Sequence, residues 1–246
     1  MKGLKRLILL LLISFLFVSI KGVKAFADSY NVYADSYILM EKSTKRVLAG
    51  NNIHKSSLPA SITKILTCIT AIENGNLDEY YKITKEAVNQ EGSKVYFEIN
   101  EEVKLIDLLY GMMLRSGNDC AYMVSVCVSK SEEKFVELMN EKARMIGMKN
   151  SIFNNSSGLD ENSTNHTTAY DMAILMSYCL DNEVFRKITE TVTYSFKNKD
   201  GLVRTIENKH KLVKGYDFVT GGKTGDGWIY AQKRWVYNWW EEVCCI

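Results

Sequence analysis

The order of two hydrophobic patterns along the chain constrains its fold more than any other feature. Strand-like segments come first, at residues 37–41 and 46–48 on either side of a polar turn. Apolar residues then recur at helical spacing over residues 61–73, 105–114, 121–128, 132–146 and 169–180. Strand-like segments return at residues 192–196, 202–207 and 218–223. This order predicts an α+β fold with an antiparallel sheet, helices on its faces and a helical sub-lobe.

The segments between these elements carry weaker signals. Residues 80–103 are mixed, with short strands expected around Val95, Tyr96 and Phe97, and residues 150–165 form a loop rich in Ser, Asn and Gly. With 246 residues the chain can bury one sizeable core. It shows no internal repeat and no linker that would divide it, so one main domain is expected.

The N-terminal residues have the pattern of a signal peptide. Lys2, Lys5 and Arg6 precede an apolar run at residues 7–20, and Ala25-Phe26-Ala27 is a small-x-small cleavage site. A retained membrane anchor is the alternative, but fourteen residues are short for a span of about 20. We therefore expect residues 1–27 to be removed, and the protein to be exported to the extracellular or cell-envelope side of the cytoplasmic membrane.

The composition argues against several classes of partner. Hydrophobic residues make up 46% and charged residues 24% of a chain with a net charge of +2, so no basic field for nucleic acid is expected. Three scattered histidines form no HxxxH pair, which argues against a metal site. Four cysteines lie in apolar, helix-like stretches without a CxxC pair, which favours core residues over disulfides. They are Cys68, Cys120, Cys127 and Cys179.

Ser61 and Lys64 form a Ser-x-x-Lys motif at the start of a predicted buried helix. Residues three apart on a helix project from one face, so the hydroxyl and the amine lie within reach of each other. A serine hydroxyl is a weak nucleophile until a base takes its proton, and a lysine becomes that base only when burial or a nearby cation lowers its pKa. The motif alone is short enough to occur by chance.

A second motif, Ser116-Gly117-Asn118, lies in the loop between two predicted helices. In that position a hydroxyl can relay a proton, and an amide can hold both a lysine and a substrate carbonyl. Ser and Asn also favour helix N-caps, so the motif by itself fits a simple cap equally well.

A third motif, Gly-Gly-Lys-Thr-Gly at residues 221–225, ends a predicted strand. Its glycines would let a ligand backbone lie close to the strand edge, where Lys223 and Thr224 could bind a carboxylate. The alternative is a glycine-rich hairpin turn with a solvated lysine.

In the order Ser-x-x-Lys, Ser-x-Asn and Lys-Thr-Gly, the motifs form the signature of penicillin-binding proteins and class A β-lactamases. From about residue 35 to Gly225 the chain resembles the serine-type D-alanyl-D-alanine carboxypeptidases, low-molecular-mass penicillin-binding proteins of the peptidase S11, sporulation-associated type. The resemblance extends to residues 37–41, 46–48, 58–61, 108–113, 135–140, 143–148, 153–159, 166–169 and Asp171. It implies a β-lactamase/transpeptidase-like peptidase domain over residues 28–225.

The resemblance also implies a reaction that needs no cofactor. Ser61 would attack the carbonyl between the two terminal D-alanines of a peptidoglycan stem peptide, and Lys64 would accept its proton. Ser116 and Asn118 would position Lys64 and pass protons to the leaving amine. Water would then release the acyl-enzyme, and β-lactams would acylate the same serine.

The third motif and the backbone complete the implied site. Lys223 and Thr224, with Gly225, would bind the terminal carboxylate of the substrate, and the charge of Lys223 would help to keep Lys64 neutral. The oxyanion hole would use the backbone N–H groups of Ser61 and Asp226. His166 invites a Ser-His triad interpretation, but its place in the resemblance is structural, at the entry to a helix.

Beyond Gly225 the resemblance ends. All four tryptophans and the pair Cys244-Cys245 lie in the last nineteen residues, a shift in composition that favours a truncated gene or an out-of-frame tail at residues 226–246. We therefore expect the C-terminal strands and the closing helix of the domain to be incomplete. The small C-terminal domain and amphipathic anchor that such enzymes carry are not evident either, and contact with a membrane surface stays open.

Two other functions remain compatible with the motifs. A class A β-lactamase needs a glutamate that speeds hydrolysis of the acyl-enzyme, and no glutamate here can be given that role from the sequence. Ser-Gly-Asn in place of Ser-Asp-Asn also favours the carboxypeptidase. The atypical tail supports a second alternative, an inactive fragment that at most binds stem peptides.

Overall fold

The main sheet brings together the two ends of the described chain. The computed structural model describes residues 34–159, 165–217, 219–225, 228–234 and 242–245, so the expected signal peptide lies outside the described residues. The sheet has the strand order β2-β1-β9-β8-β7, and every neighbouring pair is antiparallel. Its strands are β1 (Tyr37–Glu41), β2 (Val47–Asn51), β7 (Val219–Gly225), β8 (Trp228–Arg234) and β9 (Glu242–Cys245).

Two strands, β8 and β9, follow β7 in the part of the chain that the structure describes, and the expectation of incomplete C-terminal elements stays a prediction. β8 pairs with β7 from Trp228 opposite Gly225 to Lys233 opposite Val219, and β9 lies between β8 and β1. Strand pairing uses backbone groups, and aromatic and β-branched residues such as those at the start of β8 favour it. A segment that does not resemble the family can therefore still add strands to the sheet. In the described part of the chain after β7, only strands are present.

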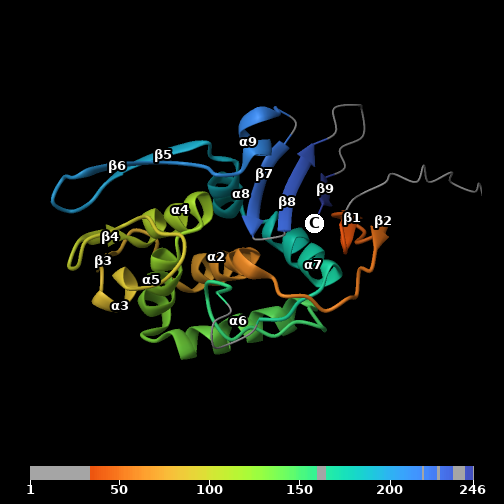
Figure 1. Ribbon diagram of the computed structural model, residues 1–246, viewed down its shortest axis with the longest axis horizontal. Coiled ribbons are helices and arrows are strands. Elements are labelled where there is room, and N and C mark those ends of the chain that lie inside the picture. The colour runs from red at the N-terminus through yellow and green to blue at the C-terminus, as the bar shows by residue number, and fades with distance from the viewer. Residues whose placement is uncertain (1–33, 160–164, 218, 226–227, 235–241, 246) are drawn as a thin grey trace, which may run out of the picture. The chain divides into compact units, whose positions relative to one another are not determined.

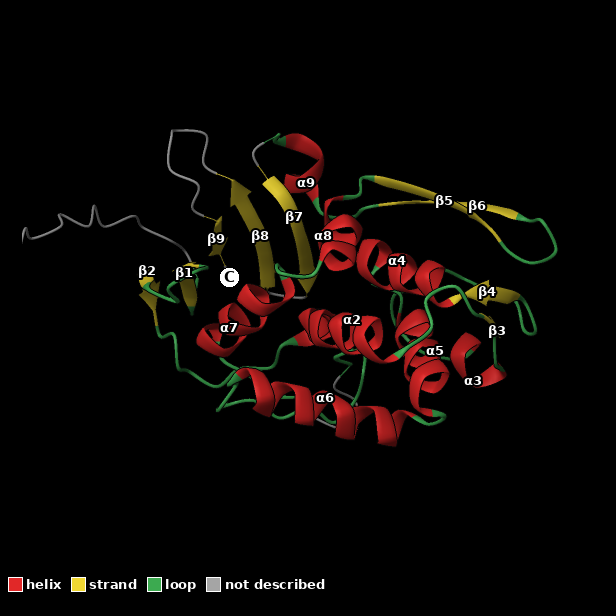
Figure 2. Ribbon diagram, turned by 180° about the vertical axis from the view of Figure 1, so that it is seen from behind, coloured by secondary structure: helices red, strands yellow, loops and turns green. Residues whose placement is uncertain are grey.

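The helices pack beneath the sheet around a central helix, α2 (Figures 1 and 2). Residues 63–71 of α2 are all buried, because the helix contacts α4, α5, α6, α7 and α8. The helical elements are η1 (Ala60–Ile62), α2 (Thr63–Asn74), α3 (Lys85–Val88), α4 (Leu105–Arg115), α5 (Asn118–Ser129), α6 (Glu132–Ile146), α7 (Ala169–Cys179), α8 (Glu183–Glu190) and α9 (Lys211–Gly215).

All five predicted helices are confirmed, and so is the α+β class. The main core is formed mostly by helix residues, which include all four predicted core cysteines, free and buried. A second, smaller core joins α7 to the sheet through Ile38 and Met40. The short helices α3, α8 and α9 were not predicted.

Two strand pairs stand apart from the main sheet. β3 (Tyr80–Lys82) pairs with β4 (Glu102–Lys104), and β5 (Thr193–Lys197) pairs with β6 (Val203–Glu207) in a ribbon that extends away from the helices (Figure 1). The late strands at residues 192–207 were thus predicted correctly as strands, but they do not belong to the main sheet.

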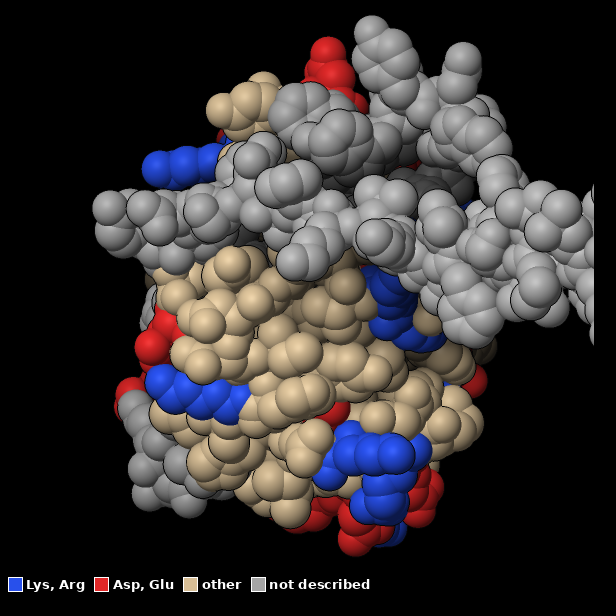
Figure 3. Space-filling view, turned by 90° about the vertical axis from the view of Figure 1, so that its right-hand side faces the viewer, with Lys and Arg blue, Asp and Glu red and all other residues tan. Residues whose placement is uncertain are grey.

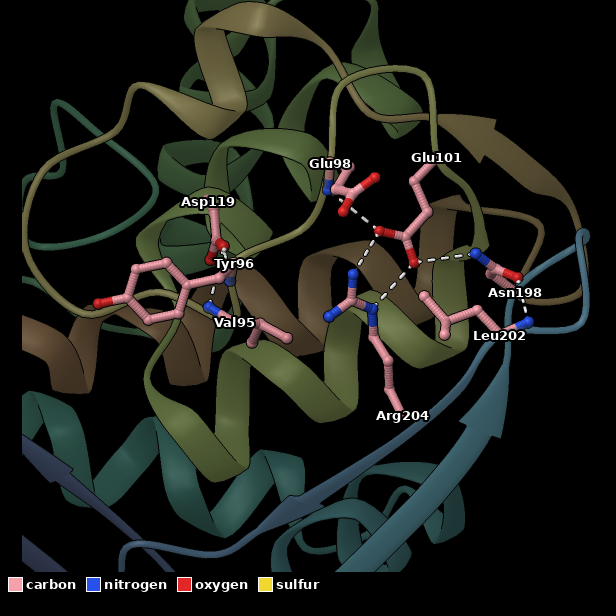
Figure 4. Close-up of polar contacts among 8 residues, drawn as sticks. All are labelled: Val95, Tyr96, Glu98, Glu101, Asp119, Asn198, Leu202 and Arg204. Carbon is pink, nitrogen blue, oxygen red and sulfur yellow. Dashed lines mark hydrogen bonds and ion pairs between the residues drawn. The ribbon is translucent and has the colours of Figure 1, made fainter.

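A buried ion pair fastens the β5–β6 ribbon to the helical part. The Nε and Nη2 atoms of Arg204 donate to the two carboxylate oxygens of Glu101 at 2.9 and 2.7 Å, and Asn198 donates to the same carboxylate at 3.1 Å (Figure 4). Paired, bidentate contacts of this kind are strong and directional. The ribbon is therefore held in a defined position beside the segment that precedes α4.

The expected strands around Val95–Phe97 are absent, and a loop occupies residues 89–101. The reason is the carboxylate of Asp119: its Oδ2 atom accepts the N–H groups of Val95 and Tyr96 at 2.9 and 3.0 Å (Figure 4). Since a side chain satisfies these two backbone donors, they do not require a neighbouring strand.

On the face at the β1 and β2 side, the described surface is mostly uncharged, with blue and red side chains mainly toward its edges (Figure 3). Within the described residues, no helix combines the length and the apolar character needed to cross a bilayer.

Candidate active site

The chain enters the Ser61 turn in a constrained conformation. Ala60 has a φ of +46°, and a Cβ atom on Gly158 would lie 1.8 Å from the Ala60 carbonyl oxygen. Gly158 itself has a φ of +81°. Only glycine combines this φ with such a close approach of two backbones. The loop after Phe153 therefore packs tightly against Ala60, the residue before Ser61. Ser61 itself stays partly exposed, in η1 just before α2.

Lys64 is fully buried and makes three polar contacts through its Nζ atom. The acceptors are the Ser61 Oγ atom at 3.1 Å, the Asn118 Oδ1 atom at 2.7 Å and the Ser157 carbonyl oxygen at 2.6 Å. The Asn118 amide is oriented by its Nδ2 group, which donates to the Glu91 carbonyl at 2.7 Å.

This set of contacts suits a neutral amine. A neutral lysine has two N–H donors and one lone pair. The Asn118 and Ser157 oxygens can only accept, so they take the two hydrogens. The lone pair then faces Ser61, whose hydroxyl can donate. The predicted nucleophile and base are thus brought together in the geometry of general-base activation.

Burial lowers the pKa of Lys64 from 10.5 to about 7. The neighbouring Cys120 and Asp119 act in the opposite direction, and the positive charge of Lys209 lowers the pKa further. The sequence analysis named burial or a nearby cation as the cause and expected Lys223 to help. In the structure burial is the largest cause, and Lys209 is a cation that acts in the same direction. The charges of Lys64 and Lys223 also act on each other.

Lys223 and Ser116 form a second pair beside the first. Lys223 is 1% exposed, and its Nζ atom donates to the Ser116 Oγ atom at 2.9 Å and to the Thr224 carbonyl oxygen. Burial, followed by the charges of Lys64 and Lys209, holds the pKa of Lys223 well below its usual range. Ser116 was predicted to position Lys64 together with Asn118. Among the described contacts Asn118 has this role, and Ser116 contacts Lys223 instead.

The end of β7 lies against the nucleophile turn. A Cβ atom on Gly225 would come within 3.2 Å of the Ser61 nitrogen and 3.1 Å of the Ile62 nitrogen, so glycine permits the strand to pass this close. Thr224 and Gly225 are partly exposed at this point. The predicted oxyanion-hole partner Asp226 lies outside the described residues.

The junction of α4 and α5 explains how Ser116 and Asn118 reach different lysines. Ser116 caps the C-terminus of α4 in the left-handed region with a φ of +61°, and α5 begins at Asn118. The backbone N–H of Asn118 donates to the Ser93 carbonyl oxygen at 2.7 Å, which fixes the start of α5 against the preceding loop. The two side chains on either side of Gly117 therefore point to different partners.

Sequence reasoning missed the backbone groups of the site. The carbonyls of Ser157 and Glu91 orient Lys64 and Asn118, but a main-chain oxygen leaves no side-chain signal in a sequence. Gly158 was detectable in principle, because a glycine in an Asn-rich loop signals a special conformation. His166 pairs through its backbone with Ile152 at 2.9 Å in both directions, which supports its predicted structural role.

Fold and site together bring a serine hydroxyl and a buried lysine amine within hydrogen-bonding distance, the arrangement expected for acyl transfer with a lysine base. The peptidase S11 family model, described as D-alanyl-D-alanine carboxypeptidase, matches residues 23–228. The chain therefore belongs to this family.

Similar proteins agree with this assignment. The chain is 34% identical over 197 residues to D-alanyl-D-alanine carboxypeptidase DacF of Bacillus subtilis, covering 78% of this chain and 50% of the relative. It is 29% identical over 184 residues to a D-alanyl-D-alanine carboxypeptidase of Streptomyces sp. strain K15, covering 68% of this chain and 63% of that relative. The chain thus spans about half to two thirds of the length of these relatives.

A solved structure shows the same fold. The crystal structure of a D-alanyl-D-alanine carboxypeptidase from Mycobacterium tuberculosis H37Rv superposes with a TM-score of 0.79 at 25% identity, covering 87% of this chain and 81% of that chain. The penicillin-binding, transpeptidase-like architecture expected from the motifs is confirmed.

Proposed function

We propose that the chain is a serine D-alanyl-D-alanine carboxypeptidase that removes the terminal D-alanine from peptidoglycan stem peptides. The observation that carries this proposal is the buried Lys64 amine, held by Asn118 and Ser157 so that its free position faces the Ser61 hydroxyl. Membership of the family supports the choice of substrate.

The reaction follows from the positions of the groups. The Lys64 lone pair takes the Ser61 proton as Oγ attacks the carbonyl between the two D-alanines. Negative charge develops on that carbonyl oxygen, near the Ser61 N–H group, which lies beside the end of β7. The C–N bond then breaks, Lys64 gives the proton it took from Ser61 to the leaving amine by way of the Ser116 hydroxyl, and the acyl group stays on Ser61.

The third motif supplies the binding of the leaving group. In this proposal Lys223 and Thr224, both in β7, hold the terminal carboxylate of the substrate. Water then attacks the acyl-enzyme, and Lys64 accepts a proton from the water and passes it to the Ser61 oxygen as the acyl bond breaks, which regenerates Ser61. A β-lactam acylates the same oxygen by opening its ring.

The test is covalent labelling of the purified chain with a fluorescent penicillin, followed by intact mass measurement. We expect one adduct, its absence in Ser61→Ala, and release of D-alanine from an acyl-D-Ala-D-Ala peptide. Rapid turnover of nitrocefin without D-alanine release would support a β-lactamase instead. A folded chain that neither labels nor releases D-alanine would be an inactive fragment.

We propose in addition that the protein is exported and acts on the cell-envelope side of the cytoplasmic membrane. The basic, apolar and small-residue pattern of residues 2–27 supports this location. Intact mass of the protein recovered outside the cytoplasm tests it, with Asp28 expected as the first residue. Recovery of the uncleaved chain in the membrane fraction would favour a retained anchor.

A further inference from the structure

A pocket of about 380 Å3 opens beside the Ser-Gly-Asn motif. Its walls are residues 94–96 of the loop before β4, Arg115 at the end of α4, and residues 205–207 of β6. Arg115 immediately precedes Ser116. The loop that contributes the first wall also binds Asn118, through the carbonyl oxygens of Glu91 and Ser93 at 2.7 Å each. The pocket therefore shares its framework with the groups that hold Lys64.

Arg115 is the charged group of this pocket that lacks a partner. The Lys94 Nζ atom donates to the Val88 carbonyl oxygen at 2.9 Å, and Glu207 forms an ion pair with Lys214 at 3.1 Å. The Arg115 side chain is half-buried, yet it makes no hydrogen bond or ion pair with any residue that the structure describes. A guanidinium offers a planar fork of N–H donors that matches a carboxylate.

A second cation lies close to Arg115. The Lys209 amine donates to the Ser93 hydroxyl at 3.2 Å, and its backbone N–H donates to the Leu114 carbonyl oxygen at 2.9 Å. Burial and then the charge of Arg115 lower the pKa of Lys209, which places the two cations within electrostatic reach of each other. Two neighbouring positive groups produce a local potential that attracts an anion.

Tyr96 supplies an aromatic surface in the same pocket. It has a φ of +64°, unusual for a bulky residue, and its side chain is 73% exposed. Asp119 holds this conformation by accepting the N–H groups of Val95 and Tyr96, and the ring projects away from that carboxylate (Figure 4). A strained backbone that displays an exposed ring beside an active site is characteristic of ligand-binding loops.

We propose that this pocket binds the part of the donor peptide that precedes D-Ala-D-Ala, with Arg115 donating to a carboxylate on the side chain of the preceding residue and Tyr96 packing against the peptide backbone. The inference rests on the proposed function. Lys223 and Thr224 take the terminal carboxylate in that mechanism, so Arg115 is available for a second anionic group of the substrate. The side chain of the residue before D-Ala-D-Ala can carry such a group.

Two peptides that differ by one carboxylate test the proposal. In acyl-X-D-Ala-D-Ala, X is L-lysine in one substrate and meso-diaminopimelate in the other, which is lysine with a carboxylate on its terminal carbon. We expect the chain to prefer the diaminopimelate peptide about tenfold in kcat/KM, as one charged hydrogen-bonded contact provides. Arg115→Gln should reduce this ratio to near one, and Arg115→Lys should retain part of it.

The controls separate this inference from the proposed function. Arg144→Gln, at an exposed position in the last turn of α6, should leave the ratio as it is. The rate of penicillin acylation reports on the Ser61 and Lys64 centre in every variant. A ratio near one in the unaltered chain, or one that Arg115→Gln leaves intact, would overturn the carboxylate site while D-alanine release still supports the carboxypeptidase. Absence of both labelling and release would overturn the proposed function itself.

Discussion

The rate of Ser61 acylation should rise about tenfold between about pH 6 and about pH 8. Only the neutral Lys64 amine can accept the Ser61 proton, and burial lowers its pKa to about 7. One pH unit below the pKa about a tenth of the amines are neutral, and one unit above about nine tenths are. A lysine with the ordinary pKa of 10.5 would instead be almost wholly charged over this range.

The assay is the second-order rate constant for a fluorescent penicillin, measured by stopped flow at constant ionic strength. Four charged or titratable groups bear on the midpoint, namely Asp119, Cys120, Lys209 and Lys223. Since the charge of Lys209 lowers the pKa of Lys64, Lys209→Gln should move the midpoint to higher pH. Lys211→Gln, which removes an exposed charge two residues away, is the matched control.

Two results would refute this reasoning. A rate that stays flat over this pH range, with the fold intact by circular dichroism, would mean that Lys64 does not titrate there. Identical midpoints for Lys209→Gln and Lys211→Gln would remove Lys209 as a cause of the lowered pKa, and burial alone would have to explain it.

Three substitutions test the supports of the site. Lys64→Met should abolish acylation yet raise the free energy of unfolding by about 2 kcal/mol. Burial of the Lys64 charge costs the folded state on the order of 4 kcal/mol, and removing that cost outweighs the penalty of leaving two carbonyl acceptors without a donor. Asp119→Ala should lower that free energy by about 2–3 kcal/mol, since three backbone N–H groups lose their acceptor. Gly158→Ala should lower it by roughly 2 kcal/mol or more and slow acylation, because its Cβ atom would meet the Ala60 carbonyl.

Each of these has a measurement and a control. Urea unfolding monitored by circular dichroism gives the free energies, and penicillin labelling gives the acylation rates. The gain in Lys64→Met should shrink as pH rises from about 7 to 10.5, because the unfolded lysine holds its proton over that window and the folded one does not. A stability gain that stays constant over this pH range would contradict the lowered pKa of Lys64. Gly201→Ala is the control, because Gly201 also has a positive φ but open space where a Cβ would lie. An equal loss of unfolding free energy in Gly201→Ala would show that crowding is not the cause at Gly158.

The sequence predicted which residues form the site better than it predicted which of them contact each other. Ser61 and Lys64 were predictable because three-residue spacing on a helix brings two side chains together whatever the rest of the fold does. Asn118 was also predicted to hold Lys64, and the structure shows this contact, but the pairing of Ser116 with Lys223 was not predictable, since it depends on the left-handed turn at Ser116. Such a turn directs neighbouring residues to different partners, and no side-chain pattern reports it.

The loop before β4 shows a different limit. Val95, Tyr96 and Phe97 have high strand propensity, and a strand was the reasonable prediction. Their backbone donors are satisfied by Asp119, a residue more than twenty positions away in the chain. Tertiary contacts of this kind override local propensity, and they can be recognised only when the fold is known.

The tail differs from this loop, because its composition is atypical and its strands are nevertheless paired. β9 lies between β1 and β8, with Met40 opposite Cys244 and Lys233 opposite Val243. A chain that ends at Arg234 would leave the β1–β2 and β7–β8 pairs as two ribbons with unpaired edges. Exposed edges favour aggregation, and β7 carries Lys223 into the site.

We therefore expect the chain shortened to Arg234 to lose penicillin labelling and to elute as aggregates in size-exclusion chromatography. The effect should be cooperative, because β9 supplies backbone partners to both of its neighbours and each lost pairing exposes donors and acceptors on two strands. A single Cys244→Ser substitution keeps the backbone pairing and serves as the control. A shortened chain that stays monomeric and labels as fast as the full chain would contradict this role of β9, and would mean that the residues up to Arg234 suffice to hold Lys223 beside Ser116.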